Sequence, residues 1–159
     1  MALGGEGVRR LGWNEADVEL EIPARPEYVS LARLVISSLA SSRRELADDR
    51  IDDLKLAVSE ACTNAIEAYP AAGEERVILR WRDGPDRLEI DVQDEGPGFD
   101  PSTLPERLTV ADPARPQFDR GLGVPLMRAL VDEVVFSSSD DGTSVAIIVY
   151  CPPVAPGSE

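Results

Sequence analysis

Two short runs of alternating residues, joined by a tight polar turn, constrain the fold of this chain more than any other feature. Residues 77–81 and 88–92 each carry an apolar side chain at every second position, and the turn sequence Asp-Gly-Pro-Asp occupies residues 83–86. A period of two is typical of a strand with one buried face. A short turn with Gly and Pro between two such runs indicates a hairpin, so the sequence predicts two antiparallel strands whose apolar face other elements must cover.

The rest of the chain predicts three further strands and three amphipathic helices. They are a strand at 18–22, helices at 26–39, at about 48–69 and at 124–131, and strands at 134–136 and 145–150, with residues 137–142 connecting the last two. Strands with helices on one side predict an α+β fold, a two-layer α/β sandwich.

A chain of 159 residues is long enough for one domain. We expect tails at 1–16 and 152–159 and a folded domain over 17–151. Residues 97–116 hold five prolines and no regular period, which favours a mobile functional loop over a simple connection.

Composition excludes several function classes. The chain has no histidine, which excludes a Ser-His-Asp triad, a histidine-ligated zinc and a phosphohistidine of its own. Its single lysine, Lys55, has no phosphate-binding P-loop around it and no Gly-rich strand pair before it. The net charge of −14 disfavours direct binding to nucleic acid or to an anionic membrane.

Cysteine usage and hydropathy point to the cytoplasm. Cys62 and Cys151 lie 89 residues apart without a Cys-x-x-Cys motif, so we expect two reduced thiols. No apolar run reaches the length of a membrane-spanning helix, and the N-terminus lacks a signal-peptide core.

A carboxylate and an amide lie one helical turn apart on the second predicted helix. Glu60 and Asn64 are four residues apart, beside the apolar stripe of that helix. A carboxylate can orient or deprotonate a nucleophile, and an amide oxygen can bind Mg²⁺. Taken alone, the pair is more often a solvated helix face.

Three glycine-containing segments carry the remaining chemistry. Asp94 follows the hairpin and precedes Gly96 and Gly98, an arrangement that suits recognition of an exocyclic amine but is also ordinary turn chemistry. The segment 120–123, Arg-Gly-Leu-Gly, is expected just before a helix, where free N–H groups can bind phosphate; a simple loop-to-helix junction is the alternative. Thr143 after Gly142 could support Asp94 or mark a hairpin exit.

In this order, the motifs resemble those of the GHKL-type ATPase family, which includes the ATPase domains of gyrase, Hsp90, MutL and histidine kinases. The resemblance spans about residues 17–150. The segments 59–65 (Ser-Glu-Ala-Cys-Thr-Asn-Ala) and 121–127 (Gly-Leu-Gly-Val-Pro-Leu-Met) are similar to those of bacterial anti-sigma factor serine kinases. The resemblance implies a mixed, mostly antiparallel sheet with helices on one face.

The resemblance also implies roles for individual residues. Glu60 would be the general base, Asn64 would hold Mg²⁺, Asp94 would accept a hydrogen bond from the adenine amine, and Thr143 would support Asp94. The ATP-binding residues would further include Gly96, Gly98, Arg120, Gly121, Leu122 and Gly123, with residues 100–120 as the ATP lid. Arg33 would contact protein partners, although a solvated arginine is the alternative there.

The function implied is that of an ATP-dependent serine/threonine kinase and anti-sigma factor. It would phosphorylate a STAS-type anti-anti-sigma protein, sequester a sigma factor, and form a homodimer. The alternatives are a nucleotide-sensing module that binds partners without catalysis and a catalytic domain that serves a histidine kinase in trans. Two features depart from the family pattern: Arg120 directly precedes Gly121, and residues 67–69 (Glu-Ala-Tyr) occupy the stretch where many relatives carry a histidine.

Overall fold

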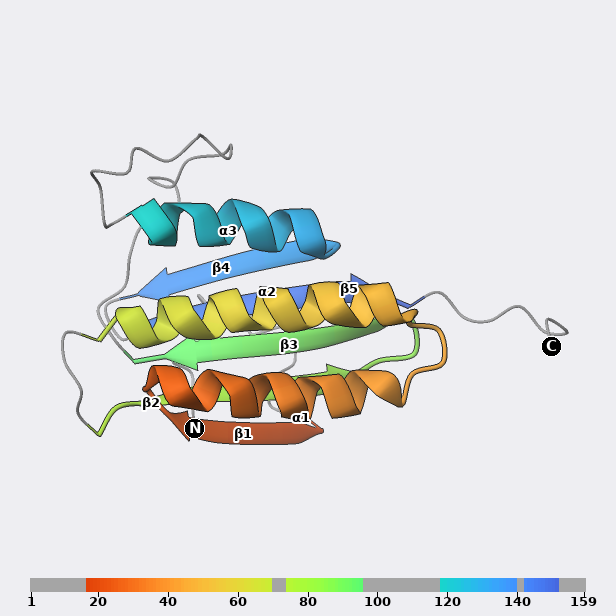
Figure 1. Cartoon of the computed structure of the whole chain (residues 1–159), viewed down its shortest axis with the longest axis horizontal. Coiled ribbons are helices and arrows are strands. Elements are labelled where there is room, and N and C mark those ends of the chain that lie inside the picture. The colour runs from red at the N-terminus through yellow and green to blue at the C-terminus, as the bar shows by residue number, and fades with distance from the viewer. Residues whose placement is uncertain (1–16, 70–73, 96–117, 140–141, 152–159) are drawn as a thin grey trace, which may run out of the picture.

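The computed structural model describes residues 17–69, 74–95, 118–139 and 142–151 (Figure 1). A 3-10 turn at Pro26–Tyr28 leads into the first helix. In chain order the strands and helices are β1 (Val18–Pro23), α1 (Val29–Ser41), α2 (Asp48–Glu67), β2 (Arg76–Asp83), β3 (Arg87–Asp94), α3 (Phe118–Leu130), β4 (Glu133–Ser139) and β5 (Gly142–Tyr150).

The strands form one sheet in the order β1-β2-β3-β5-β4. All four pairings among the described strands are antiparallel, which corrects the expectation of a mixed sheet. Two helices connect β1 to β2 and return the chain to the end where β1 stopped, so the neighbouring strands run in opposite directions. Only one helix, α3, connects β3 to β4, and these two strands run in the same direction. They are not paired with each other, because β5 lies between them in the sheet.

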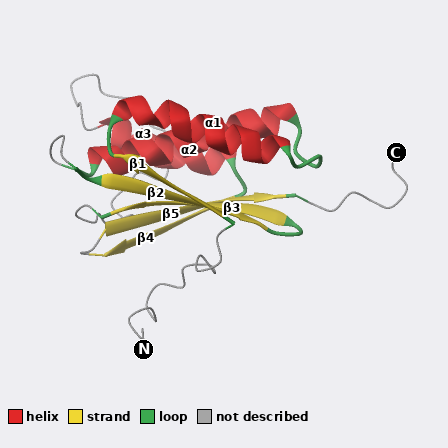
Figure 2. Ribbon diagram, turned by 90° about the horizontal axis from the view of Figure 1, so that it is seen from below, coloured by secondary structure: helices red, strands yellow, loops and turns green. Residues whose placement is uncertain are grey.

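The helices cover one face of the sheet, as expected for a two-layer sandwich (Figure 2). Alternate residues of β2 point into this layer boundary, where Val77, Leu79 and Trp81 are buried. Leu88, Ile90 and Val92 of β3 join them. The predicted hairpin and its apolar face are therefore confirmed.

Several predicted boundaries were wrong. Helix α3 begins at Phe118 instead of residue 124, so Gly121, Gly123 and Pro125 lie within it. Glycine and proline are poor interior helix residues, which is why the sequence pattern placed the start too late, whereas α3 gains its stability by packing against α2. Residues 137–139 belong to β4 because its pairing continues to the contact of Ser139 with Gly142.

The predicted tails and most of the predicted lid, up to residue 117, lie outside the described residues. Within the described ranges no helix is long and apolar enough to cross a membrane.

Candidate active site

Helix α2 presents Glu60 and Asn64 beside its buried face. Its core stripe includes Val58, Ala61 and Ala65, which are buried against the sheet, while Glu60 and Asn64 are half-buried at the edge of that stripe. Because four residues make about one helical turn, the two polar side chains lie one above the other. The structure thus places the predicted pair at a partly enclosed position and not on a fully solvated face.

Gly123 of α3 lies directly against this pair. A Cβ built at Gly123 would be 3.1 Å from Glu60 Oε2 and 3.2 Å from Asn64 Nδ2. Any side chain at residue 123 would therefore press on the carboxylate and the amide together. Three residues predicted as functional, separated by about 60 positions in sequence, meet at one point where α3 packs on α2.

Asp94 and Thr143 form the second part of the site, at the end of the sheet. They are register partners on β3 and β5, and both side chains face the helix layer. Asp94 is 4% exposed and Thr143 is 3% exposed. The Thr143 hydroxyl lies 3.2 Å from the Ser138 hydroxyl on β4, so three strands contribute to this polar end of the core. A buried carboxylate needs hydrogen-bond donors, which makes Asp94 suited to bind a donor group.

Gly142 permits the chain to pass close to Asp94. Its φ of +140° lies in a region that side-chain-bearing residues rarely adopt. A Cβ there would be 2.0 Å from the carbonyl oxygen of Asp94, a distance that no packing can accommodate. The approach of β5 to the end of β3 therefore requires glycine at residue 142.

The two parts of the site lie at the same end of the molecule. In Figure 1 the C-terminal end of α2, the arrowhead of β3 and the first turns of α3 all lie on the left. A direct contact also joins the end of α2 to the end of β3, since the Glu95 backbone N–H donates to the Tyr69 hydroxyl at 2.8 Å.

The structure describes the other predicted ATP-binding residues only in part. Gly96 and Gly98 lie outside the described residues, and the backbone of Arg120, Gly121 and Leu122 lies in the first turns of α3. Gly121 is the fourth residue of α3 and lies near its positive end, where a negative charge is favoured. Gly123 is the sixth residue of α3 and lies within the helical hydrogen-bond ladder, so its lack of a side chain is the property that matters there.

Arg33 is not part of this cluster. It is exposed on α1, beside the exposed leucines Leu31 and Leu34. Two other residues at the site escaped prediction. The sequence marks Tyr69 only as part of a stretch that replaces a histidine, and it predicts a loop at Ser138 because a run of three serines carries no strand pattern.

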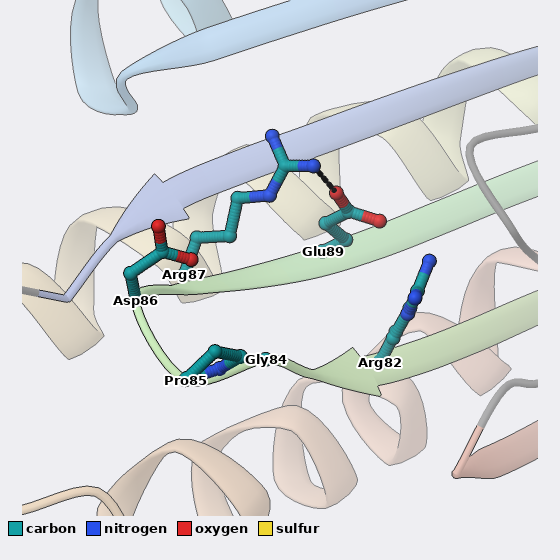
Figure 3. Close-up of a pocket in the computed structure, with 6 residues that line it drawn as sticks. All are labelled: Arg82, Gly84, Pro85, Asp86, Arg87 and Glu89. Atoms are coloured by element: carbon teal, nitrogen blue, oxygen red, sulfur yellow. Dashed lines mark ion pairs between the residues drawn. The ribbon is translucent and has the colours of Figure 1, made fainter.

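A small pocket lies elsewhere, on the sheet face opposite the helices (Figure 3). It surrounds the β2–β3 turn at Gly84 and includes Arg82, Arg87 and the buried Glu89. The Arg87 guanidinium and the Glu89 carboxylate form an ion pair at 2.9 Å, drawn as a dashed line in Figure 3. Arg87 and Asp94 occupy opposite ends of β3, about 23 Å apart by strand geometry, so this pocket is separate from the site at Asp94.

The residues present could hold a nucleotide with a cation. Gly123 lets α3 approach a carboxylate and an amide more closely than a residue with a side chain would allow. Mg²⁺ commonly uses one or two protein oxygens and takes its other ligands from phosphate and water, which matches a single Asn oxygen at a phosphate site. Asp94 provides an acceptor at the other end of the site.

Comparison with known proteins identifies the family of the chain. Residues 22–149 match the model of the histidine kinase-like ATPase domain family. The chain is 42% identical over 142 residues to the serine-protein kinase RsbW of Bacillus subtilis, an alignment that covers 86% of this chain and 88% of the relative. The corresponding protein of Bacillus pumilus is 43% identical, with 84% of this chain and 85% of the relative covered.

Solved structures support the fold. The RsbU and RsbW domains of Rv1364c from Mycobacterium tuberculosis align with a TM-score of 0.58 at 17% identity, covering 86% of this chain and 34% of that chain. The present chain thus spans about a third of that larger protein. The mycobacterial sensor histidine kinase MprB aligns with a TM-score of 0.52 at 20% identity, covering 86% of this chain and 100% of that chain. With 128 of its 159 residues matched by the family model, the chain belongs to the histidine kinase-like ATPase domain family.

Proposed function

We propose that this protein is an ATP-dependent serine/threonine protein kinase and anti-sigma factor, which phosphorylates a STAS-type anti-anti-sigma protein. The observation that carries the proposal is the contact of Gly123 with Glu60 and Asn64, which brings a general-base candidate and a cation ligand together beside the start of α3. Support also comes from relatives that are named serine-protein kinases and are aligned over most of this chain.

In this proposal Asp94 binds the base of the nucleotide. Its buried carboxylate accepts a hydrogen bond from the exocyclic amine of adenine, and Thr143 holds the carboxylate in place. Gly96 and Gly98, which lie outside the described residues, belong to the proposed adenine site. A base without an exocyclic amine at this position cannot donate that hydrogen bond to Asp94, which gives a physical reason for selecting adenine.

The phosphates lie between α2 and the start of α3. Asn64 would hold Mg²⁺ through its amide oxygen, and the ion would supply positive charge beside the phosphates. Gly121 and Leu122 lie near the positive end of α3, which favours the negative charge of the phosphates, and Arg120 provides a further cation. Residues 100–120 act as the lid over the bound nucleotide.

Glu60 is the general base. It accepts the proton of the substrate serine hydroxyl while the serine oxygen bonds to the γ-phosphorus and the bond from that phosphorus to the ADP oxygen breaks. Its half-buried position against Gly123 restricts the carboxylate to few orientations. Such positioning is the main contribution that a protein makes to phosphoryl transfer.

We assign the partner surface to α1. Around the axis of α1, Leu34 at 64% exposure lies between Arg33 and Leu31, which is 41% exposed. A basic residue near exposed leucines suits a partner surface that combines acidic and apolar groups. In this proposal the sigma factor and the STAS protein bind there, the kinase is a homodimer of the folded unit 17–151, and the protein acts in the cytoplasm.

Transfer of labelled γ-phosphate tests the proposal. Purified protein with Mg-ATP and a lysate of the native host should place an acid-stable, base-labile label on a small protein. Glu60→Gln should retain ATP binding and lose transfer by about 10²–10⁴-fold, the usual contribution of a general base. Asn64→Ala should lose both.

Glu67→Gln is the matched control, because Glu67 is an exposed glutamate on the same helix. It should transfer phosphate at the wild-type rate. Full transfer by Glu60→Gln would remove Glu60 from the role of base. ATP binding without transfer to any protein would instead indicate a nucleotide-sensing module that binds partners without catalysis.

A further inference from the structure

The hydroxyl group of Tyr69 connects three elements at the edge of the candidate site. Tyr69 lies two residues beyond α2, and its backbone N–H donates to Ile66 at 3.2 Å, which continues the helical turn. Its hydroxyl donates to the carbonyl oxygen of Arg76, the first residue of β2, at 3.0 Å. The same hydroxyl accepts from the backbone N–H of Glu95 at 2.8 Å. One side chain thus ties the end of α2 to the start of β2 and the end of β3.

The bond to Glu95 acts on the peptide group of Asp94. The N–H of Glu95 and the carbonyl of Asp94 belong to one planar peptide unit. Tyr69 holds the N–H side of this unit, and Gly142 packs closely against the carbonyl oxygen on the other side. The peptide is therefore held from both sides, and its orientation fixes the direction in which the Asp94 side chain leaves the backbone.

The same helix carries the residues at the phosphate end. Tyr69 follows Asn64 by five residues and Glu60 by nine. At 1.5 Å per residue these separations are about 7.5 Å and about 13.5 Å along the helix. Any movement of α2 relative to β3 would therefore change the distance between Asp94 and the Glu60–Asn64 pair unless the hydroxyl of Tyr69 held the two elements together.

The hydroxyl keeps its proton under ordinary conditions. Partial burial raises the pKa of Tyr69, the N–H of Glu95 lowers it, and the negative charges of Asp94, Glu95 and Glu75 raise it further. A protonated hydroxyl is required for the bond that it donates to the carbonyl of Arg76.

We propose that Tyr69 is a positioning residue for nucleotide selection, which holds the base-binding carboxylate of Asp94 at a fixed place relative to the phosphate-binding residues of α2. This inference rests on the proposed function. In this proposal the hydroxyl of Tyr69 contributes more to adenine recognition than to the stability of the fold.

Tyr69→Phe tests the inference, because it removes the hydroxyl and retains the ring. Titration calorimetry with Mg-ATP and Mg-GTP should show that ATP affinity falls by roughly three- to tenfold, as expected for hydrogen bonds that orient a binding group. GTP affinity should change by less than about twofold, since the carboxylate of Asp94 does not recognise guanine. The preference for ATP over GTP should therefore fall.

A double-mutant cycle identifies the route of the effect. If Tyr69 acts through Asp94, then Tyr69→Phe should leave the ATP-to-GTP ratio unchanged in an Asp94→Asn background. Tyr150→Phe is the matched control. It also removes a hydroxyl with a hydrogen bond, 2.5 Å to Glu133, but at the opposite end of the sheet, and the ATP-to-GTP ratio should stay at the wild-type value.

The outcomes separate the inference from the proposed function. Absence of ATP binding by the wild-type protein would overturn the proposed function itself. Wild-type binding with an unchanged ratio in Tyr69→Phe, or with equal losses for ATP and GTP, would overturn the inference. Amide hydrogen exchange of wild-type protein provides a test that needs no variant: the N–H of Glu95 should be protected, and fast exchange with ATP bound would contradict the role of Tyr69.

Discussion

At the scale of single residues, two glycines control the site in different ways. At Gly123, a Cβ would lie 3.1 Å from the end of the Glu60 side chain, a contact that small shifts of the carboxylate and amide can relieve. At Gly142, a Cβ would lie 2.0 Å from a backbone oxygen, and the φ of +140° adds strain. The contact at Gly123 therefore bears on the proposed chemistry, and the contact at Gly142 bears on the fold.

Gly123→Ala should reduce phosphate transfer by about tenfold without loss of stability. The added methyl group displaces Glu60 and Asn64 by a few tenths of an ångström, and transfer rates are sensitive to such displacements. Alanine is favoured over glycine in a helix interior by about 1 kcal/mol, so the free energy of unfolding should be unchanged or higher. Single-turnover transfer and urea unfolding measure the two effects. Wild-type transfer by this variant would mean that the contact has no role in the reaction.

Gly142→Ala should instead destabilise the whole domain by at least about 2 kcal/mol, through backbone strain and the clash with Asp94. Urea unfolding should show a lower midpoint than in the wild type and in Gly123→Ala, which is the control for adding one methyl group. An unchanged midpoint would contradict the strained approach of β5 to β3.

The sequence could predict the Glu60–Asn64 pair but neither of these two glycine roles. Helical periodicity placed Glu60 and Asn64 on one face because four residues make one turn. The close approach at Gly142 depends on the register of β3 with β5, whose strands lie about 50 residues apart in sequence. Local patterns contain no information on that register, so the steric requirement at residue 142 emerged only from the structure.

At the scale of elements, local patterns located the helices and strands better than their ends. The hairpin of β2 and β3 follows from alternation, whereas the first turns of α3 contain glycines and are stabilised by packing on α2. The position of β5 between β3 and β4 is likewise a tertiary feature. The link from Tyr69 to Glu95 joins two elements 26 residues apart and has no sequence signature.

Helix α1 carries two exposed leucines, and one substitution there should separate partner binding from nucleotide binding. Leu34 is 64% exposed, so Leu34→Asp should change the free energy of unfolding by less than about 0.5 kcal/mol and leave ATP affinity unchanged. It should reduce sigma-factor binding by at least tenfold if α1 is the partner surface. Co-purification of the sigma factor with immobilised protein measures this loss.

Leu56→Asp is the control, because Leu56 is an exposed leucine on α2. It should bind the sigma factor as the wild type does. Equal loss in both variants would indicate a general effect of added negative charge on a chain that already carries −14, and retention by Leu34→Asp would move the partner surface away from α1.

At the scale of the whole molecule, the candidate site joins the two layers of the sandwich. Glu60, Asn64 and Gly123 belong to the helix layer, and Asp94 and Thr143 belong to the sheet. A nucleotide bound by both groups would contact both layers at once. Since unfolding separates the layers, such a ligand should stabilise the entire domain and not one element.

Thermal unfolding measures this coupling. At a concentration of Mg-ATP one hundred times its Kd, ligand binding adds about 2.7 kcal/mol to the free energy of unfolding. For a chain of this length, that increase corresponds to a rise in Tm of about 5–10 °C. Mg-GTP at the same concentration should raise Tm by less, because the acceptor at Asp94 does not match guanine.

Asp94→Asn should remove the difference between the two nucleotides, since an amide no longer offers a full carboxylate to the adenine amine. Asn64→Ala should reduce the Tm shift for both nucleotides, because the loss lies at the phosphate end that they share. A shift in Tm that is the same for ATP and GTP in the wild type would place the bound nucleotide away from Asp94, and the two groups of residues would then not form one site.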